Sequence, residues 1–143
     1  MTDTLTVLER SQRMARVTGV DTKPELIVRQ LLWRMGYRYR LHARDLPGNP
    51  DIVFRSRKRA IFVHGCFWHR HSDPACRLAR LPKSRLDFWV PKLEGNRARD
   101  AENISQLKTL GWHVLLVWEC RMKDREQLGN RLYWFVEGID EGD

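Results

Sequence analysis

The sequence predicts an α/β fold in which a mixed β-sheet is flanked by helices on both faces. Three observations predict it: short apolar runs with strand-like patterning, three segments with helical spacing, and turn signals between them. They give the order helix, strand, strand, strand, helix, strand, helix. The 143 residues amount to about one domain, and no linker rich in Gly, Ser or Pro divides them. We therefore expect a single domain over residues 1–143.

The first half of the chain predicts one helix and three strands. Thr22 can cap the helix, Glu25 completes a capping box in its first turn, and Gly36 ends it. The composition of the segments that follow predicts a strand over 37–41 and a loop over 46–50. It then predicts a hairpin with strands over 51–54 and 59–63.

The second half predicts a long loop, two helices and one strand. The loop covers 64–86, a helix follows over about 86–110, and a last helix covers about 124–137. Residues 112–118 are apolar on both faces apart from one histidine, which predicts a central strand covered on two sides. The buried face of the longer helix is expected from apolar residues at a spacing of three: Ala98, Ala101, Ile104, Leu107 and Leu110.

The charge of the chain predicts a polyanionic partner. There are 26 Lys and Arg residues against 18 Asp and Glu residues, which gives a net charge of +8. The alternative is a soluble protein that is merely basic. No apolar run is long enough to span a membrane, and the first residues contain acids and no cleavable apolar segment. We therefore expect a cytoplasmic protein.

The cysteines and one histidine predict a zinc site. Cys66, His71 and Cys76 are separated by four residues each in the long loop, and Cys120 follows the apolar strand. Three thiolates and an imidazole form a standard tetrahedral set for Zn²⁺, and such a site would attach the long loop to the sheet. Two alternatives remain: His69 in place of His71 as the ligand, and three unrelated buried thiols.

A carboxylate and two histidines predict a second site at the hairpin. Asp51 begins the first hairpin strand, His64 follows the end of the second, and His69 comes five residues later. A carboxylate, a backbone carbonyl and phosphate oxygens can hold Mg²⁺, and a histidine can take a proton from water at neutral pH. Taken singly, Asp51 is also a common turn residue, the histidines are ordinary loop residues, and Glu25 is explained by its capping box.

These residues lie in longer segments that resemble the very-short-patch-repair mismatch endonucleases. The likeness covers about residues 9–136, and the run HGCFWH at 64–69 is highly specific to that family. The remaining matching segments are Ser11–Met14, Asp21-Thr22 with Glu25, LPGNPDIVF at 46–54, FW at 88–89, NRARD at 96–100 and GWHVLLVWEC at 111–120.

The resemblance implies a restriction-endonuclease-like fold and a bacterial DNA-repair enzyme of the nucleoid. Such enzymes recognise the T:G mismatch that deamination of 5-methylcytosine creates, and they hydrolyse the phosphodiester 5′ of the mismatched T. The resemblance implies Mg²⁺ for the reaction and a separate structural Zn²⁺. We expect a monomer whose partners are double-stranded DNA with a T:G mismatch and mismatch-repair proteins.

The resemblance also implies catalytic roles for individual residues. Asp51 would bind Mg²⁺ together with the main-chain carbonyl of Val63, and His69 would be the general base. Asp100 and Glu25 would support His69. A further histidine, His64, would contact and stabilise the scissile phosphate.

The remaining roles concern zinc and DNA. The zinc ligands implied are Cys66, His71, Cys76 and Cys120. Aromatic residues would insert beside the mismatch from the major groove, and they are Phe67, Trp68 and Trp89. The segment 1–20 would contact DNA, with the region of Met14 approaching from the minor groove. Trp112 and Trp118 lie on the apolar strand, and we expect them in the core.

Two other functions are compatible with the same residues. One is a zinc-stabilised DNA-binding module without catalysis, and the other is a restriction-type nuclease of the same fold that cuts matched DNA. The combination of Asp51, His64 and His69 favours the enzyme.

Overall fold

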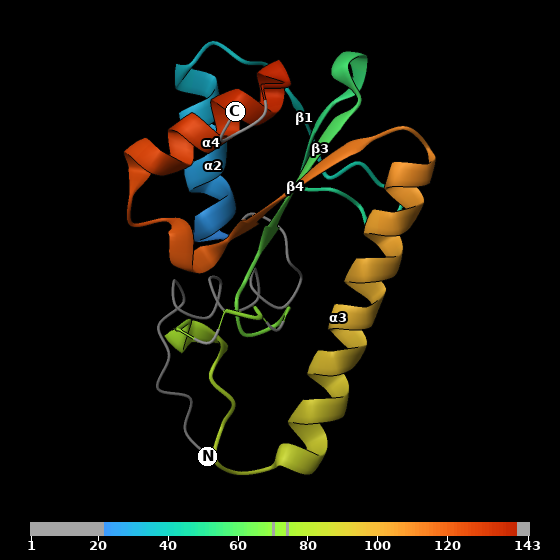
Figure 1. Ribbon diagram of the computed structural model, residues 1–143, viewed down its shortest axis with the longest axis vertical. Helices are drawn as coiled ribbons and strands as arrows, with labels where there is room; N and C mark the ends of the chain where they lie inside the picture. Colours follow the sequence, from blue (N-terminus) through green and yellow to red (C-terminus); the bar gives the residue numbers. More distant parts are fainter. Residues whose placement is uncertain (1–21, 70, 74, 140–143) are drawn as a thin grey trace, which may run out of the picture.

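The computed structural model describes residues 22–69, 71–73 and 75–139, and it contains a four-stranded mixed sheet with three α-helices (Figure 1). The predicted order of helices and strands is confirmed. The elements are α2 (Lys23–Arg34), β1 (Arg40–Leu41), β2 (Ile52–Phe54), β3 (Arg59–His64), α3 (Leu86–Thr109), β4 (His113–Trp118) and α4 (Arg125–Glu137).

The strands follow the order β1-β2-β3-β4, so that β4 lies at an edge of the sheet. The pairs β1–β2 and β2–β3 are antiparallel, whereas β3 and β4 are parallel. The prediction of a central strand over 112–118 was therefore wrong in its position within the sheet. Its apolar pattern reports that both faces of the strand are covered, and it says nothing about how many strands pair with it.

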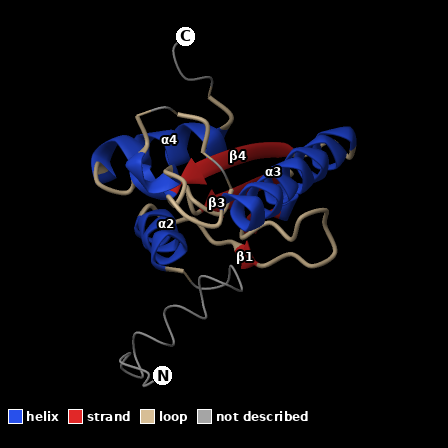
Figure 2. Cartoon of the chain, turned by 90° about the horizontal axis from the view of Figure 1, so that it is seen from below, coloured by secondary structure: helices blue, strands red, loops and turns tan. Residues whose placement is uncertain are grey.

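Helices cover both faces of the sheet, as predicted. Figure 2 shows α2 and α4 on one side and α3 on the other. The larger core cluster joins α2 and α4 to the sheet, and its buried members are Val28, Leu32, Ile52, Phe54, Ile61, Val117, Met122, Leu128, Leu132 and Val136. A smaller cluster contains Ala43, Val53 and Ala60, with Leu46 and Trp112 packed against it.

Helix α3 turns inward only part of the face that its apolar residues predicted. Of the five expected residues, Leu107 is buried and Ile104 is half-buried, whereas Ala98, Ala101 and Leu110 are exposed. Leu93, which was not expected, is also buried. Residues 96 and 100, an asparagine and an aspartate, lie at helical spacing from Leu93 and are half-buried. The spacing of apolar residues cannot identify a buried helix face when some of the residues on that face are polar.

Helices α2 and α4 begin with the expected capping chemistry. The Oγ1 atom of Thr22 accepts a hydrogen bond from the backbone N–H of Glu25 at 3.4 Å, as the capping box predicted. Helix α4 is capped by Asp124, whose Oδ1 accepts from the N–H of Gln127 at 2.9 Å. Within the described ranges, none of the helices combines the length and the apolar character that crossing a bilayer requires.

The packing of α4 against the sheet leads to a stability prediction. Leu132 is fully buried, whereas the neighbouring Tyr133 is 44% exposed. We expect Leu132→Ala to lower the free energy of unfolding by about 2–5 kcal/mol, because it removes buried apolar atoms and leaves a cavity. Urea unfolding followed by circular dichroism measures this. Tyr133→Ala is the matched control, and an equal loss in both variants would contradict the assignment.

Candidate active site and metal centre

The C-terminal ends of the two parallel strands bring the reactive side chains together. His64 ends β3 and pairs with Trp118, which ends β4. The chain then turns, and the N–H of His69 donates to the carbonyl of Gly65 at 3.1 Å. This turn stacks the imidazole of His69 on that of His64, with ring centroids 3.8 Å apart and planes 6° apart. Two residues predicted to act in one site are therefore in direct contact.

Asp100 orients His69. Its Oδ2 lies 2.5 Å from the Nδ1 atom of His69, reaching across from α3. A carboxylate at Nδ1 fixes that nitrogen as the protonated one, so that Nε2 is the atom with a lone pair for a proton. This arrangement makes His69 suited to act as a base.

His64 is buried with one nitrogen unpaired. The residue is 4% exposed, and its Nδ1 has no hydrogen-bond partner among the described residues. Burial lowers the pKa of His64 to about 3, and the neighbouring His69 contributes to the fall. The ring is therefore neutral near pH 7, and since buried polar atoms are normally paired, its free nitrogen points to a ligand or water.

Asp51 is held at the start of the hairpin by the partner strand. Its Oδ2 accepts a hydrogen bond from the backbone N–H of Val63 at 2.7 Å. Burial raises the pKa of Asp51 to about 8, and the nearby carboxylate of Glu25 contributes to the rise. A carboxylate in this environment is stabilised by a cation, because a cation offsets both the lost hydration and the like charge.

The loop before Asp51 packs closely on α3. Gly48 has a φ of +76°, and a Cβ atom added there would lie 2.9 Å from the Cβ of Asn103. Both the backbone conformation and the close approach require glycine at this position. The loop therefore fixes the start of the hairpin relative to the helix that carries Asp100.

Glu25 lies beside Asp51. It is 1% exposed, and it contacts Arg29 and the Nε2 atom of His42, which lies 3.0 Å from Oε2. Of the two residues expected to support the general base, the structure places Asp100 against His69 and Glu25 against Asp51. Sequence reasoning missed His42, because it follows a short strand and no spacing relates it to Asp51.

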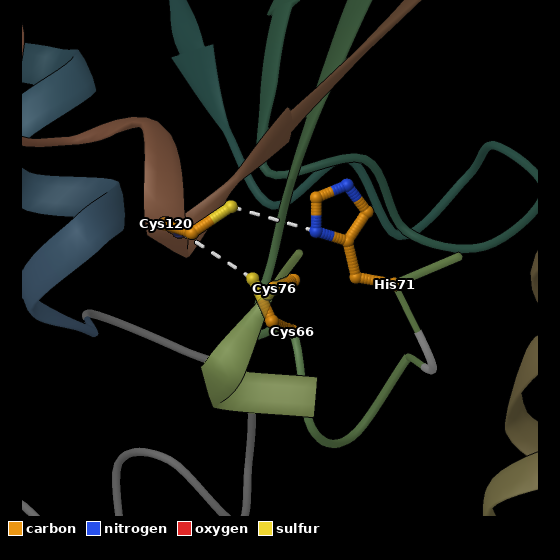
Figure 3. A group of neighbouring side chains, drawn as sticks. All are labelled: Cys66, His71, Cys76 and Cys120. Atoms are coloured by element: carbon orange, nitrogen blue, oxygen red, sulfur yellow. Dashed lines mark hydrogen bonds between the residues drawn. The ribbon is translucent and has the colours of Figure 1, made fainter. Parts of the chain in front are cut away.

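The four predicted zinc ligands converge (Figure 3). Their donor atoms all lie within 4.8 Å of one another. The sulfur of Cys120 lies 3.4 Å from Nδ1 of His71. The backbone N–H of Cys120 donates to the sulfur of Cys66 at 3.4 Å. The fourth member is Cys76. His69, the alternative ligand, lies with Asp100 instead.

The chemistry of this donor set fits a bound cation. Burial raises the pKa values of the Cys66 and Cys120 thiols, because a buried thiolate lacks hydration. A divalent cation would reverse this effect, since it bonds to the thiolate directly. Three sulfurs and one imidazole nitrogen are the ligands that Zn²⁺ prefers. The cluster therefore could hold a metal ion.

Trp118 connects the metal centre to the paired histidines. Its ring stacks on His71 at 4.2 Å, and it meets His64 edge-on at 5.2 Å. Its side chain was expected in the core, but the residue is half-buried and lies between the two sites. Trp112 does pack against the smaller core cluster, as expected.

Three aromatic side chains gather between the loop that carries His69 and the first turns of α3. Phe67, Trp68 and Trp89 contact one another in edge-on geometry, with centroids 5.2 to 6.0 Å apart. Asn96 holds this cluster on α3, because its Nδ2 donates to the carbonyl of Trp68 at 3.1 Å. All three rings are half-buried, so each presents some surface to solvent. Met14 and the segment 1–20 lie outside the described residues.

Comparison with known proteins gives consistent matches. A family model described as DNA mismatch endonuclease Vsr matches residues 2–75. The chain is 52% identical over 132 residues to the type II nicking enzyme V.XorIIP of Xanthomonas oryzae pv. oryzae, covering 92% of this chain and 95% of that one. It is 40% identical to the type II nicking enzyme V.NmeAIP of Neisseria meningitidis, covering 99% of both chains. It is 42% identical over 119 residues to DNA mismatch endonuclease Vsr of Escherichia coli, covering 83% of this chain and 74% of that one.

The metal centre leads to a prediction for Cys120→Ala. We expect this variant to lose about one bound zinc per chain and to be destabilised by several kcal/mol, because metal binding and loop folding are coupled. Metal analysis and thermal unfolding measure the two effects. Ser72→Ala, an exposed change in the same loop, is the matched control. A zinc-free Cys120→Ala protein with the unfolding temperature of the control would refute the coupling.

Proposed function

The chain belongs to the Vsr family of DNA mismatch endonucleases, and we propose that it nicks double-stranded DNA 5′ of the T in a T:G mismatch. The observation that carries the proposal is the convergence of His64, His69 and Asp100 at the ends of β3 and β4. Asp51 lies near the same end of β3, because its carboxylate accepts a hydrogen bond from the backbone N–H of Val63. An acid, a neutral imidazole and an oriented base are the groups that hydrolysis of a phosphodiester requires.

The reaction would depend on Mg²⁺, held by Asp51 with the main-chain carbonyl of Val63. The ion would polarise the phosphoryl group and lower the pKa of the attacking water. His69 would take the proton of that water at Nε2, while Asp100 stabilises the imidazolium through Nδ1. His64, neutral and with an unpaired nitrogen, would hydrogen-bond to the scissile phosphate.

The aromatic cluster supports a preference for mismatched DNA. Phe67 and Trp68 directly precede His69 in the chain, and Trp89 contacts both of their rings. A base step opened by these rings would therefore bring a nearby phosphate towards His69. Unstacking a step costs a few kcal/mol, and the cost is lowest where pairing is already weak. A wobble pair would therefore admit the rings more readily than a Watson–Crick pair.

Several further features belong to the same proposal. The fold would be restriction-endonuclease-like, formed by one domain that acts as a monomer. Zn²⁺ at Cys66, His71, Cys76 and Cys120 would have a structural role. Mismatch-repair proteins would be its partners, and the segment 1–20 with Met14 would contact DNA from the minor groove.

A second candidate is nicking of matched DNA within a recognition sequence. Two relatives, V.XorIIP and V.NmeAIP, are named type II nicking enzymes, which supports this candidate. Duplexes that differ only in carrying T:G or C:G at one position separate the two functions. Equal cleavage of both duplexes would replace the mismatch proposal with this one.

The catalytic assignment predicts the effect of Asp51→Asn on nicking. We expect Mg²⁺-dependent nicking of the T strand of a T:G duplex to fall by about 10³-fold or more, because the metal contributes several kcal/mol to the transition state. Binding to the duplex, followed by fluorescence anisotropy, should change little. Asp45→Asn is the matched control, since Asp45 is exposed and pairs with Arg55. If Asp51→Asn nicks at the rate of the control, the assignment is wrong.

The aromatic cluster predicts a loss of mismatch selectivity in Trp68→Ala. We expect nicking of the T:G duplex to fall about 10- to 100-fold, since stacking of one base on an aromatic ring contributes about 1–3 kcal/mol. The ratio of the nicking rate on the T:G duplex to that on the C:G duplex should also fall. The matched control is Trp33→Ala, a tryptophan on α2 that is 55% exposed. An unchanged T:G to C:G ratio in Trp68→Ala would remove the cluster from mismatch recognition.

A further inference from the structure

Three elements bring a histidine and two carboxylates into one small cluster. Glu25 comes from the first turn of α2, His42 from the segment after β1, and Asp51 from the residue before β2. One ligand atom from each lies within 4.8 Å of the others. The site described above already uses Asp51 and contacts Glu25, but His42 has no role in it.

The separations within this cluster match those between ligands of one cation. The Nε2 atom of His42 lies 3.2 Å from Oε1 and 3.0 Å from Oε2 of Glu25. Adjacent ligands of an octahedral ion with bonds of about 2.1 Å are about 3.0 Å apart. The guanidinium of Arg29 also lies here, with Nη2 3.4 Å from Nε2 of His42 and in contact with Oε2 of Glu25. A divalent cation could bond to the imidazole and a carboxylate without a large movement of either side chain, provided that the Arg29 guanidinium moves away from Nε2.

The backbone around His42 holds its side chain in place. The residue has a φ of +47°, a region that non-glycine residues seldom adopt. Its N–H donates to the carbonyl of Asp51 at 3.0 Å, and the next N–H, of Ala43, donates to the carbonyl of Pro50 at 3.1 Å. The histidine is thus attached to the same segment that carries the catalytic carboxylate.

The charge of the cluster favours a cation. Glu25 is 1% exposed and Asp51 is half-buried, while Arg29 contributes one positive charge through its contact with Glu25. With both carboxyl groups ionised, one guanidinium leaves one negative charge, and burial makes that charge costly without a counterion.

We propose that His42 is a ligand of the catalytic cation, which makes the site a mixed oxygen–nitrogen site that binds Mn²⁺ more tightly than Mg²⁺. The inference rests on the proposed function, because Asp51 is the cation ligand there. Mg²⁺ prefers oxygen ligands, whereas imidazole nitrogen raises the affinity for first-row transition metals such as Mn²⁺. His42 binds the ion through Nε2, with its own proton on Nδ1.

Electron paramagnetic resonance tests this without any activity measurement. The protein, with its zinc and without DNA, is titrated with Mn²⁺, and bound Mn²⁺ is examined for coupling to a directly bonded ¹⁴N nucleus by electron spin echo envelope modulation. We expect ¹⁴N coupling in the wild type. His42→Gln and His42→Asn should lose it and bind Mn²⁺ about tenfold more weakly. Mg²⁺ affinity, measured by competition, should change by less than about threefold.

The controls separate this inference from its premise. His113→Gln removes an exposed histidine at the start of β4 and should behave as the wild type. Asn tolerates positive φ, so His42→Asn should keep the backbone, and circular dichroism and zinc content check this. Bound Mn²⁺ without ¹⁴N coupling in the wild type, or coupling that persists in both His42 variants, would overturn the proposal. Failure to nick a T:G duplex with Mg²⁺ would overturn the proposed function and leave the ligand assignment standing.

Discussion

The parallel pairing of β3 with β4 is the constraint on which the rest of the site depends. Its register places His64 opposite Trp118, and continuing both chains by two residues reaches Cys66 and Cys120, which are hydrogen-bonded. Because side chains alternate between the faces of a strand, a shift of one residue would turn each of these side chains to the opposite face. One register thus determines both the paired histidines and the convergence of the sulfurs.

The cluster of Cys66, His71, Cys76 and Cys120 and the paired histidines are parts of one packed unit. Trp118 contacts His71 on one side and His64 on the other, and His64 stacks on His69. A long irregular loop has few apolar contacts of its own, so its order must come from attachments such as the thiol cluster and the tryptophan. In this chain the same attachments set the orientation of the groups that would act on phosphate.

Patterns in the sequence could predict the elements and the ligand set, but they could not predict how faces and neighbours are arranged. The capping box at Thr22, the hairpin and the convergence of Cys66 with Cys120 follow from local chemistry and spacing. The edge position of β4 depends on hydrogen bonds between distant segments, which side-chain patterning does not report. The first half of the inward face of α3 and the contact of His42 with Glu25 were missed because polar groups there replace apolar contacts.

Helix α3 carries Trp89 near its start and Asp100 near its middle, with Asn96 between them. Trp89 belongs to the aromatic cluster, Asn96 hydrogen-bonds to the backbone of Trp68, and Asp100 contacts His69. An inserted residue between positions 89 and 100 would rotate the two ends of this segment by about 100° and separate them by about 1.5 Å. The length of this stretch is therefore fixed by its contacts: an exchange of an outward-facing side chain leaves them in place, whereas the insertion or deletion of one residue breaks them.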